Sequence, residues 1–339
     1  MNDIPFRDDQ TPEEFVDACF RVLLRREPDS LGRRHHLDRL AAGDSRLSVV
    51  AAFAGSKEYR DRERANQWVP AGHFYSPMPS IEEVAQHKRE PRSPVQFPAI
   101  DLQDRAQEKL MRAFAKLYPS IPFRDGAAEG LRYRYPNSSF PPGDAIPLHC
   151  MIRHLEPRRF IEVGSGNSSC CTLDTIERFL DEAVGLTLIE PYPEFFQSLV
   201  QPRDLEALRL LPLRLQDVPL PEFERLEARD ILFIDSTHVS KLNSDVNHLF
   251  FEILPRLQKG VFVHIHDVFF PFEYPIEWLE EGRGWNEQYV LRAFLQYNRA
   301  FEIRFFNTYL YQKERAWFEA NMPGCLRAPG GSIWLEKVL

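Results

Sequence analysis

Two histidines and two aspartates follow short apolar runs of the chain. Asp235 comes directly after the run 231–234 with His238 close behind it, and His266 and Asp267 come directly after the run 261–265. Side chains at the carboxyl ends of neighbouring parallel strands meet at one edge of a sheet, where such folds bind ligands. This group could therefore do chemistry in either of two ways, and the sequence leaves both open.

In the first way, a side chain takes the proton from a substrate hydroxyl, and we expect His266, Asp267 or His238 in this role. In the second, Asp235, His266 and Asp267 hold a divalent metal such as Mg, which lowers the pKa of that hydroxyl. His264 shares a strand face with His266, because residues two apart point the same way. We favour His266, which lies nearer the strand end, and expect His264 to be a core histidine.

A glycine turn after the apolar run 159–163 is a second place where chemistry is expected. Gly164 and Gly166 let the backbone approach a ligand where a Cβ would clash. The turn lacks the third glycine of a dinucleotide fingerprint, so alone it says little. Glu190, however, ends the next apolar run, where a carboxylate can accept both hydroxyls of a ribose. Asp217 follows a third run, near the expected place of an adenine.

These side chains need a sheet to bring them together. From residue 158 onward, apolar runs at 159–163, 184–189, 208–215, 231–234 and 261–265 alternate with helical segments, notably 168–181 and 244–257. Such alternation predicts an α/β fold with a doubly wound parallel sheet.

The first 65 residues differ from the rest. Thr11 can cap a helix that has Pro12 at its first position, and apolar residues follow at helical spacing. Two more short helices, over 29–43 and 45–53, complete a small bundle. We expect a helical module at 1–65, a proline-containing connecting segment with a helix at 66–130, and the α/β domain at 131–339.

Composition limits the function. The 339 residues carry a net charge of −8, which argues against a general nucleic-acid binder. No apolar run reaches the roughly 18 residues that a membrane span needs, and the acidic N-terminus does not have the form of a secretory signal. The five cysteines are odd in number and lack CxxC spacing, so we expect reduced thiols in a cytoplasmic protein.

The second half of the chain resembles class I S-adenosylmethionine-dependent methyltransferases. RFIEVGSGNSS is similar to their first motif, and TLIEP, LQD and ILFID are similar to the next three, in the family's order. The resemblance covers roughly residues 130 to 339. It implies a seven-stranded Rossmann-like sheet with strand order 3-2-1-4-5-7-6, in which 301–306 and 332–337 supply strands six and seven and the last strand is antiparallel.

The same resemblance implies S-adenosylmethionine as cofactor. Glu162 would face its methionine amino group, Glu190 would hold the ribose and Asp217 the adenine. The full set of cofactor residues implied is Glu162, Gly164, Ser165, Gly166, Asn167, Ser168, Glu190, Asp217, Asp235 and Ser236. The segment from Asp230 to Pro275 looks like a bacterial subgroup found with small-molecule or glycan modification, which implies O-methylation of a sugar, a glycan or another polar small molecule.

Substrate contacts are expected where this superfamily often builds a wall over the site. Tyr135, Asn137 and Asp144 precede the first strand, and Glu287 follows the fifth. Metal-dependent sugar O-methyltransferases of the superfamily use acidic residues at the two strand ends described above, which implies a metal; His266 stands where a carboxylate is usual.

The N-terminal segments LLRREPDSLGRRHHLDRL and AFAGSKEY resemble a bacterial helical module of unknown function that is related to phycobilisome linker domains. The resemblance implies an interaction role, with a protein partner. Two rival hypotheses remain for the whole chain. It could be an interaction protein whose larger domain has lost catalysis, or a metal-dependent oxygenase on a methyltransferase fold.

Overall fold

The structure is a computed structural model that describes residues 10–64, 68–90, 97–137 and 139–339. The chain forms two compact units, 1–81 and 82–339, and each is described by itself. Pro91 and Pro94 of the expected connecting segment lie outside the described residues.

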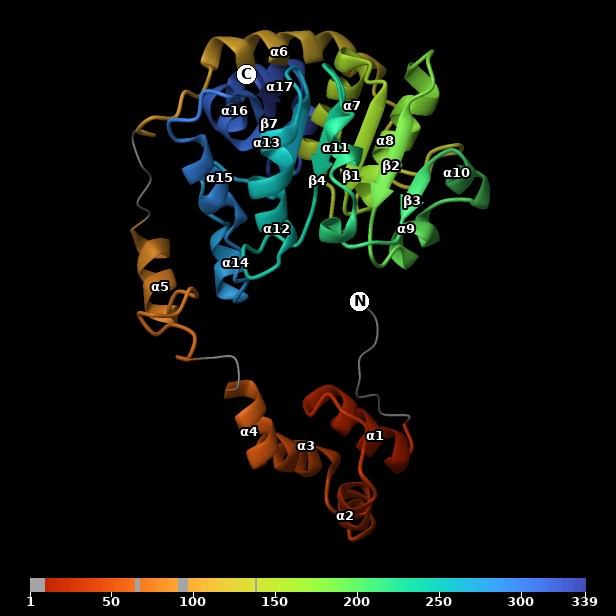
Figure 1. The fold of residues 1–339 in the computed structure, drawn as a ribbon, viewed down its shortest axis with the longest axis vertical. Coiled ribbons are helices and arrows are strands. Elements are labelled where there is room, and N and C mark those ends of the chain that lie inside the picture. Colours follow the sequence, from red (N-terminus) through yellow and green to blue (C-terminus); the bar gives the residue numbers. More distant parts are fainter. Residues whose placement is uncertain (1–9, 65–67, 91–96, 138) are drawn as a thin grey trace. The chain divides into compact units, whose positions relative to one another are not determined.

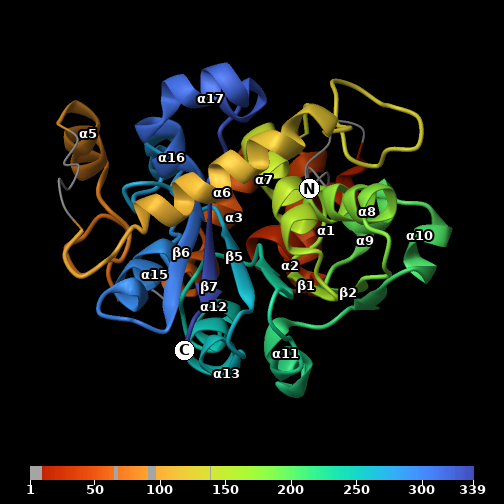
Figure 2. The same ribbon diagram turned by 90° about the horizontal axis from the view of Figure 1, so that it is seen from above.

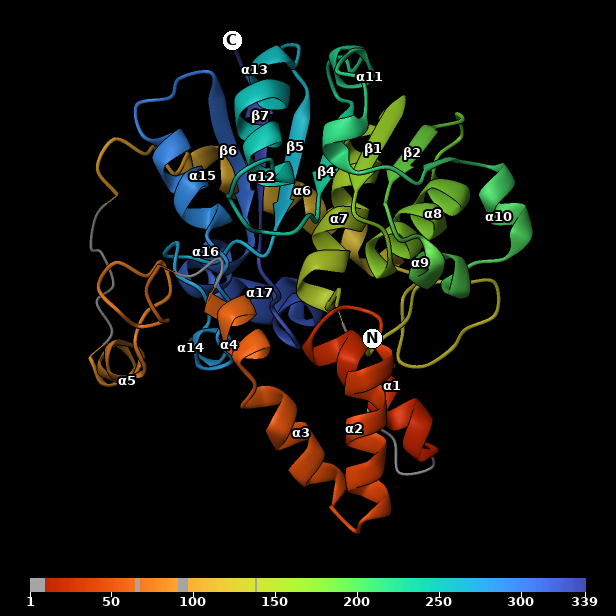
Figure 3. The same ribbon diagram turned by 60° about the horizontal axis from the view of Figure 1, so that its bottom comes forward.

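The described residues of the first unit form helices α1 (Pro12–Leu23), α2 (Ser30–Ala41), α3 (Arg46–Ala54) and α4 (Lys57–Arg64) (Figure 3). The expected cap is confirmed, because the Thr11 hydroxyl accepts from the Glu14 amide and the Glu14 carboxylate accepts from the Thr11 amide. The helices enclose a small core of their own, which contains Phe15, Val16, Cys19, Phe20, Leu24, Val49 and Phe53.

The second unit is built on one sheet of seven strands in the order β3-β2-β1-β4-β5-β7-β6. In Figure 1, β3, β2, β1 and β4 follow one another from right to left. The strands are β1 (Arg159–Val163), β2 (Gly185–Ile189), β3 (Arg209–Leu211), β4 (Ile231–Ile234), β5 (Phe262–His266), β6 (Phe301–Phe306) and β7 (Ser332–Lys337). β7 runs antiparallel to both β5 and β6, while the other pairs are parallel. The predicted α/β fold, its strand order and its antiparallel last strand are confirmed.

Helices cover both faces of this sheet (Figure 2). On one face α6 (Asp104–Leu117), α7 (Pro142–Leu155) and α8 (Asn167–Phe179) share a core with Phe160 and Phe233. On the other face η3 (Leu249–Ile253) and α15 (Glu287–Leu295) share a core with Ile161 and Ile234. The shorter helical elements are α5 (Ile81–Arg89), η1 (Tyr118–Ser120), α9 (Glu194–Leu199), α10 (Pro202–Glu206), η2 (Leu215–Asp217), α11 (Pro221–Glu224), α12 (Asp245–His248), α13 (Leu254–Arg256), α14 (Ile276–Glu280), α16 (Asn307–Lys313), α17 (Arg315–Asn321) and η4 (Pro323–Leu326).

Two predicted elements differ in detail. The third strand was expected over 208–215, but β3 ends at Leu211 because Pro212 has no N–H to continue the ladder. Asp217 consequently lies in η2 and not at a strand end. The predicted helix 244–257 is present as the consecutive elements α12, η3 and α13, of which η3 is π-helical. Among the described residues, no helix is both long and apolar enough to cross a bilayer.

Candidate functional site

The glycine turn lies between β1 and α8, and Gly164 is required there by geometry. Its φ of +83° is in the left-handed region, and an added Cβ would lie 1.9 Å from the carbonyl oxygen of Asp235. Gly166 has an extended φ of 172°, so its conformation alone does not demand glycine. A Cβ there would lie 3.2 Å from the ring of Phe195. The tight turn thus brings the end of β4 against the end of β1.

Glu162 is a fully buried carboxyl group with one oxygen in use. Its Oε1 accepts from the Ser168 hydroxyl at 2.5 Å, while Oε2 has no partner within the described part of the chain. Burial raises the pKa of Glu162 to about 8. The hydroxyls of Ser165 and Ser236 are also buried without a partner there. Polar atoms left in this state indicate that a ligand completes their hydrogen bonds.

The carboxylate of Glu190 is tied to the same turn. It accepts from the backbone amides of Ser165 at 3.2 Å and Tyr192 at 2.8 Å. The amide of Asp235 donates to the Val163 carbonyl at 2.8 Å, and Asn167 at the start of α8 is buried. Asp217, in η2, forms an exposed ion pair with Arg214 at 2.8 Å.

At the ends of β4 and β5, one imidazole lies between two carboxylates. The Nε2 atom of His238 is 3.4 Å from an oxygen of Asp235 and 3.5 Å from an oxygen of Asp267. One potential ligand atom from each of the three residues lies within 4.8 Å of the others, which is spacing that could hold a metal ion. His238 and Asp267 both have left-handed φ values, 59° and 55°, which turn their side chains back toward the strand ends.

The other nitrogen of His238, Nδ1, is 2.9 Å from an oxygen of the buried Glu287. Burial alone would lower the pKa of His238, but its hydrogen bonds with Asp235 and Glu287 raise that pKa well above the usual range. Three carboxyl groups thus surround this ring, and its orientation is held by Glu287. The arrangement favours a cation at Nε2, either a proton or a metal ion.

His266 lies beside this group and not within it. Its Nε2 is 3.6 Å from an oxygen of Asp267, and its buried Nδ1 has no partner within the described chain. The ring centroid of Phe140 is 5.3 Å away. Burial lowers the pKa of His266, but Asp267, Asp235 and Asp144 together raise it above the usual value. At ligand spacing the structure therefore joins His238, and not His266, to Asp235 and Asp267.

His264 is a core side chain. Its ring stacks on Phe233 with 3.9 Å between centroids and 7° between planes, and Trp334 packs against it. Burial holds the pKa of His264 well below its usual value, so the ring is neutral.

Three of the four residues expected to contact substrate are buried. These are Tyr135, Asp144 and Glu287, and Asp144 accepts from Asn307, Gly331 and Ser332. Asn137 bonds the backbone of its own loop, but it is half-buried and lines a hollow of about 1060 Å³. Two half-buried rings that were not predicted as site residues, Trp278 and Trp285, pack near His238. The ring centroid of Trp285 lies 4.4 Å from that of His238 and 5.1 Å from that of Trp278.

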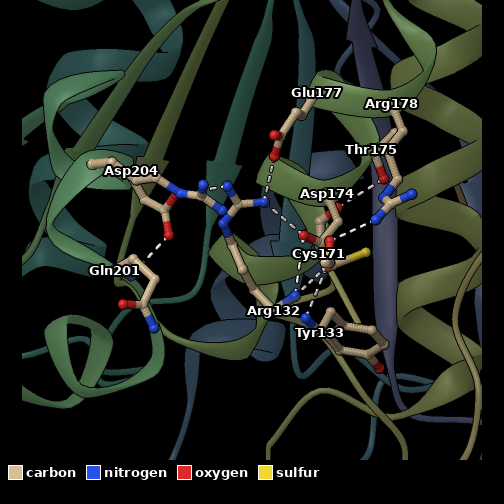
Figure 4. A network of polar contacts seen from close by, with 11 residues as sticks. Arg132, Tyr133, Cys171, Asp174, Thr175, Glu177, Arg178, Gln201 and Asp204 are labelled. Carbon is tan, nitrogen blue, oxygen red and sulfur yellow. Dashed lines mark hydrogen bonds and ion pairs between the residues drawn. The ribbon is translucent and has the colours of Figure 1, made fainter. Parts of the chain in front are cut away.

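Arg132 was also missed. It bonds Asp174 and Glu177 on α8 and Asp204 on α10 (Figure 4). The one signal that could have suggested it is the three-residue spacing of Asp174 and Glu177, which places two carboxylates on one helix face.

Comparison with known families agrees with this fold. Residues 161–268 match a family model described as a methyltransferase domain, and residues 6–62 match a domain of unknown function, DUF4214. The first match spans β1, the glycine turn and the ends of β4 and β5. With the strand order and the antiparallel β7, it defines the class: a class I methyltransferase, of the type that takes its methyl group from S-adenosylmethionine.

Within this class the chain is similar to an uncharacterized protein of the archaeon Archaeoglobus fulgidus. The two are 32% identical over 189 residues, which make up 54% of this chain and 83% of the archaeal one. The chain belongs to the same family as that protein.

Solved structures give weaker likenesses. The O-methyltransferase TomG from Streptomyces achromogenes is 18% identical, with 71% of this chain and 92% of that one covered and a TM-score of 0.39. An O-methyltransferase from Bacillus cereus is 15% identical, with 69% and 91% covered and a TM-score of 0.36. The branched-chain polyamine synthase from Thermus thermophilus is 13% identical, with 96% and 87% covered and a TM-score of 0.33. The fold assignment rests on the strand order and not on these scores.

Proposed function

We propose that the protein transfers the methyl group of S-adenosylmethionine to a hydroxyl oxygen of a sugar, a glycan or another polar small molecule. The choice of cofactor rests chiefly on the state of Glu162. A fully buried carboxyl group with one unpartnered oxygen, beside a turn that only glycine can form, suits the ammonium group of an amino acid. Ser165 and Ser236 offer two more unpartnered hydroxyls next to it.

The residues of the turn divide the work of binding. Glu162 would pair with the amino group of the methionine part, and the backbone from Gly164 to Ser168 would lie along it. Glu190, already fixed by the amides of Ser165 and Tyr192, would accept the ribose hydroxyls. When bound, S-adenosylmethionine would supply a methyl group attached to a sulfonium, from which the neutral thioether is a good leaving group. Holding the acceptor oxygen in line with the bond from sulfur to the methyl carbon would therefore contribute much of the rate.

For the acceptor, we propose that the reaction takes place beside Asp235, His238 and Asp267. Glu287 holds His238 with Nε2 between the two carboxylates. The donor set of two carboxylates and one imidazole fits a divalent ion such as Mg or Mn, and such an ion would lower the pKa of the acceptor hydroxyl. His266, with its unpartnered Nδ1, or Asp267 would take the proton.

Titration of the purified protein with S-adenosylhomocysteine tests the cofactor claim. We expect binding in the micromolar range, and at least a tenfold weaker affinity for Glu162→Gln. The matched control is Glu227→Gln, because Glu227 is an exposed glutamate that pairs with Arg159 at the start of β1. If the wild type does not bind the cofactor at millimolar concentration, the proposal is wrong.

Transfer is tested with methyl-labelled cofactor and a panel of hydroxyl acceptors. Label should appear in a neutral or acidic sugar derivative as an alkali-stable ether, because a methyl ether resists alkali and a methyl ester does not. If the labelled methyl group is instead found on the nitrogen of an amine, the proposal of an oxygen acceptor is wrong.

For the rest of the chain, we propose that residues 1–65 are an interaction module with a protein partner, that 66–130 connect it, and that 131–339 are the catalytic domain. A surface with net charge −8 does not favour nucleic acid as a partner. All five cysteines are buried and unpaired, which supports a reducing compartment such as the cytoplasm.

A further inference from the structure

Arg132 connects three segments that are far apart in the chain. Its guanidinium donates to Asp174 at 2.8 Å and to Glu177 at 2.7 Å, both on α8, and to Asp204 at 2.7 Å on α10 (Figure 4). The side chain of Arg132 is only 14% exposed, and those of Asp174 and Asp204 are 0% and 3% exposed. Replacing one partner of such a buried network leaves the others uncompensated, which is costly.

Asp174 holds the backbone at this point as well as the side chain. Its Oδ2 accepts from the amides of Arg132 at 2.9 Å and Tyr133 at 2.8 Å. Hydrogen bonds from Arg132 also hold the pKa of Asp204 below its usual value, so this carboxylate is charged and attracts the guanidinium. Arg132 begins a segment whose described residues are 132–137, 139 and 140. The start of this segment is therefore fixed to α8 and α10 by charged hydrogen bonds.

The other end of this segment reaches the proposed site. Asn137 forms two hydrogen bonds with the backbone of Phe140. Its side-chain N–H donates to the Phe140 carbonyl at 2.9 Å, and its side-chain oxygen accepts from the Phe140 amide at 2.7 Å. Tyr133 also donates to the carbonyl of Phe140. The buried ring of Phe140 then packs 5.3 Å from the ring of His266. Movement of the segment would therefore move the side chain that packs on His266.

The segment is tied to the cofactor turn too. The side-chain amide of Asn167, the first residue of α8, donates to the Ser139 hydroxyl at 3.0 Å. Between the segment and the region of α9 and α10 lies a hollow of about 1060 Å³, and its lining includes Arg132, Asn167, Phe195 and Asp204. The Arg132–Asp204 ion pair bridges the two sides of this hollow. It lies beside an apolar core that contains Tyr133 and Phe140 of the segment and Phe196 of α9.

We propose that Arg132 is a positioning residue for the methyl transfer: it holds residues 132–137, 139 and 140 so that Ser139 meets the cofactor turn and Phe140 meets His266. In this proposal Arg132 acts through Ser139 and Phe140 and not by contact with a reactant. This inference rests on the proposed function, because it predicts an effect on cofactor binding.

The test is the affinity of the full-length chain for S-adenosylhomocysteine, measured by calorimetry well below the melting temperature. Lysine keeps the charge of Arg132 but cannot reach three carboxylates, so we expect Arg132→Lys to bind at least tenfold more weakly. Asp204→Asn removes only the link to α10, and a loss of about threefold is expected.

The matched control is Arg159→Lys. Arg159 also bonds a buried carboxylate, Asp230 at 3.1 Å, but it does so at the start of β1, whereas the cofactor turn follows the end of that strand. We expect this variant to melt at a lower temperature and to keep the affinity of the wild type. Arg132→Lys should also bind S-adenosylhomocysteine more weakly, even if its melting temperature falls by no more than that of Arg159→Lys.

If Arg132→Lys melts earlier but binds like the wild type, Arg132 only stabilises the fold and the inference is wrong. If Arg132→Lys does not fold, Asp204→Asn serves instead. An about threefold loss of its affinity for the cofactor product supports the inference, and wild-type affinity contradicts it. A wild-type protein that does not bind the cofactor would instead refute the proposed function, and this inference with it.

Discussion

Several of the buried polar atoms without partners belong to residues of the proposed site. Within the described chain they include Oε2 of Glu162, the hydroxyls of Ser165 and Ser236, and Nδ1 of His266. Each such atom destabilises the fold by about 1–3 kcal/mol when nothing bonds it. A ligand with an ammonium group and several hydroxyls would offset this cost on binding. The residues that weaken the free protein are therefore the ones we expect to give affinity.

The pH dependence of cofactor binding follows from Glu162. Burial raises the pKa of its carboxyl group to about 8 in the free protein, so below that pH it is mostly protonated. A bound ammonium group stabilises the carboxylate, and binding then releases a proton. Affinity should rise with pH, by up to about tenfold per unit between pH 5.5 and 7.5. Titrations with S-adenosylhomocysteine across this range check it, and Glu162→Gln should give a flat profile.

The two candidate donor sets for a metal can be separated by substitution. We expect Mn²⁺ to bind the wild type, and His238→Gln and Asp235→Asn to weaken that binding at least tenfold, because both residues belong to the group at ligand spacing. His266→Gln should bind Mn²⁺ like the wild type. Electron paramagnetic resonance of free Mn²⁺ measures this. Loss of binding in His266→Gln alone would restore the set expected from the sequence.

Among the elements, the turn after β1 does not tolerate a side chain at Gly164. Gly164→Ala would force both a strained φ and a clash with the Asp235 carbonyl, so we expect a marked fall in melting temperature and loss of cofactor binding. Gly282→Ala is the control: its φ of +77° is similar, but a Cβ there meets nothing within 4 Å. It should cost only about 1–2 kcal/mol of stability and leave affinity unchanged.

The first five strands could be predicted from the sequence because each coincides with a short, mostly apolar run between polar turns. Pro212 was the overlooked signal in the third of them. β6 and β7 contain charged residues within the strand, and the family resemblance was needed to predict them. The contacts between side chains were harder to predict from the sequence. His238 joins Asp235 and Asp267 only because its left-handed φ turns the chain back after β4. Arg132 finds partners 42 to 72 residues away, and no periodicity encodes such contacts.

At the scale of the whole molecule, the chain has separate hydrophobic cores. The core of residues 15–53 contains a few side chains only, whereas the two cores of the second unit cover both faces of the sheet. Since a unit of about 60 residues buries a smaller fraction of its surface, it is marginally stable on its own. We therefore expect the units 1–81 and 82–339 to unfold in different transitions.

Scanning calorimetry of the full chain with and without S-adenosylhomocysteine tests this division together with the site. A ligand at 100 times its dissociation constant stabilises the form that binds it by about 2.7 kcal/mol. For a domain of this size that corresponds to a rise of roughly 5–10 °C in melting temperature. Because Glu162, Glu190 and Asp235 all belong to the second unit, only the higher transition should move. A single transition that shifts as a whole would contradict independent units, and a shift of the lower one alone would place the cofactor outside the sheet domain.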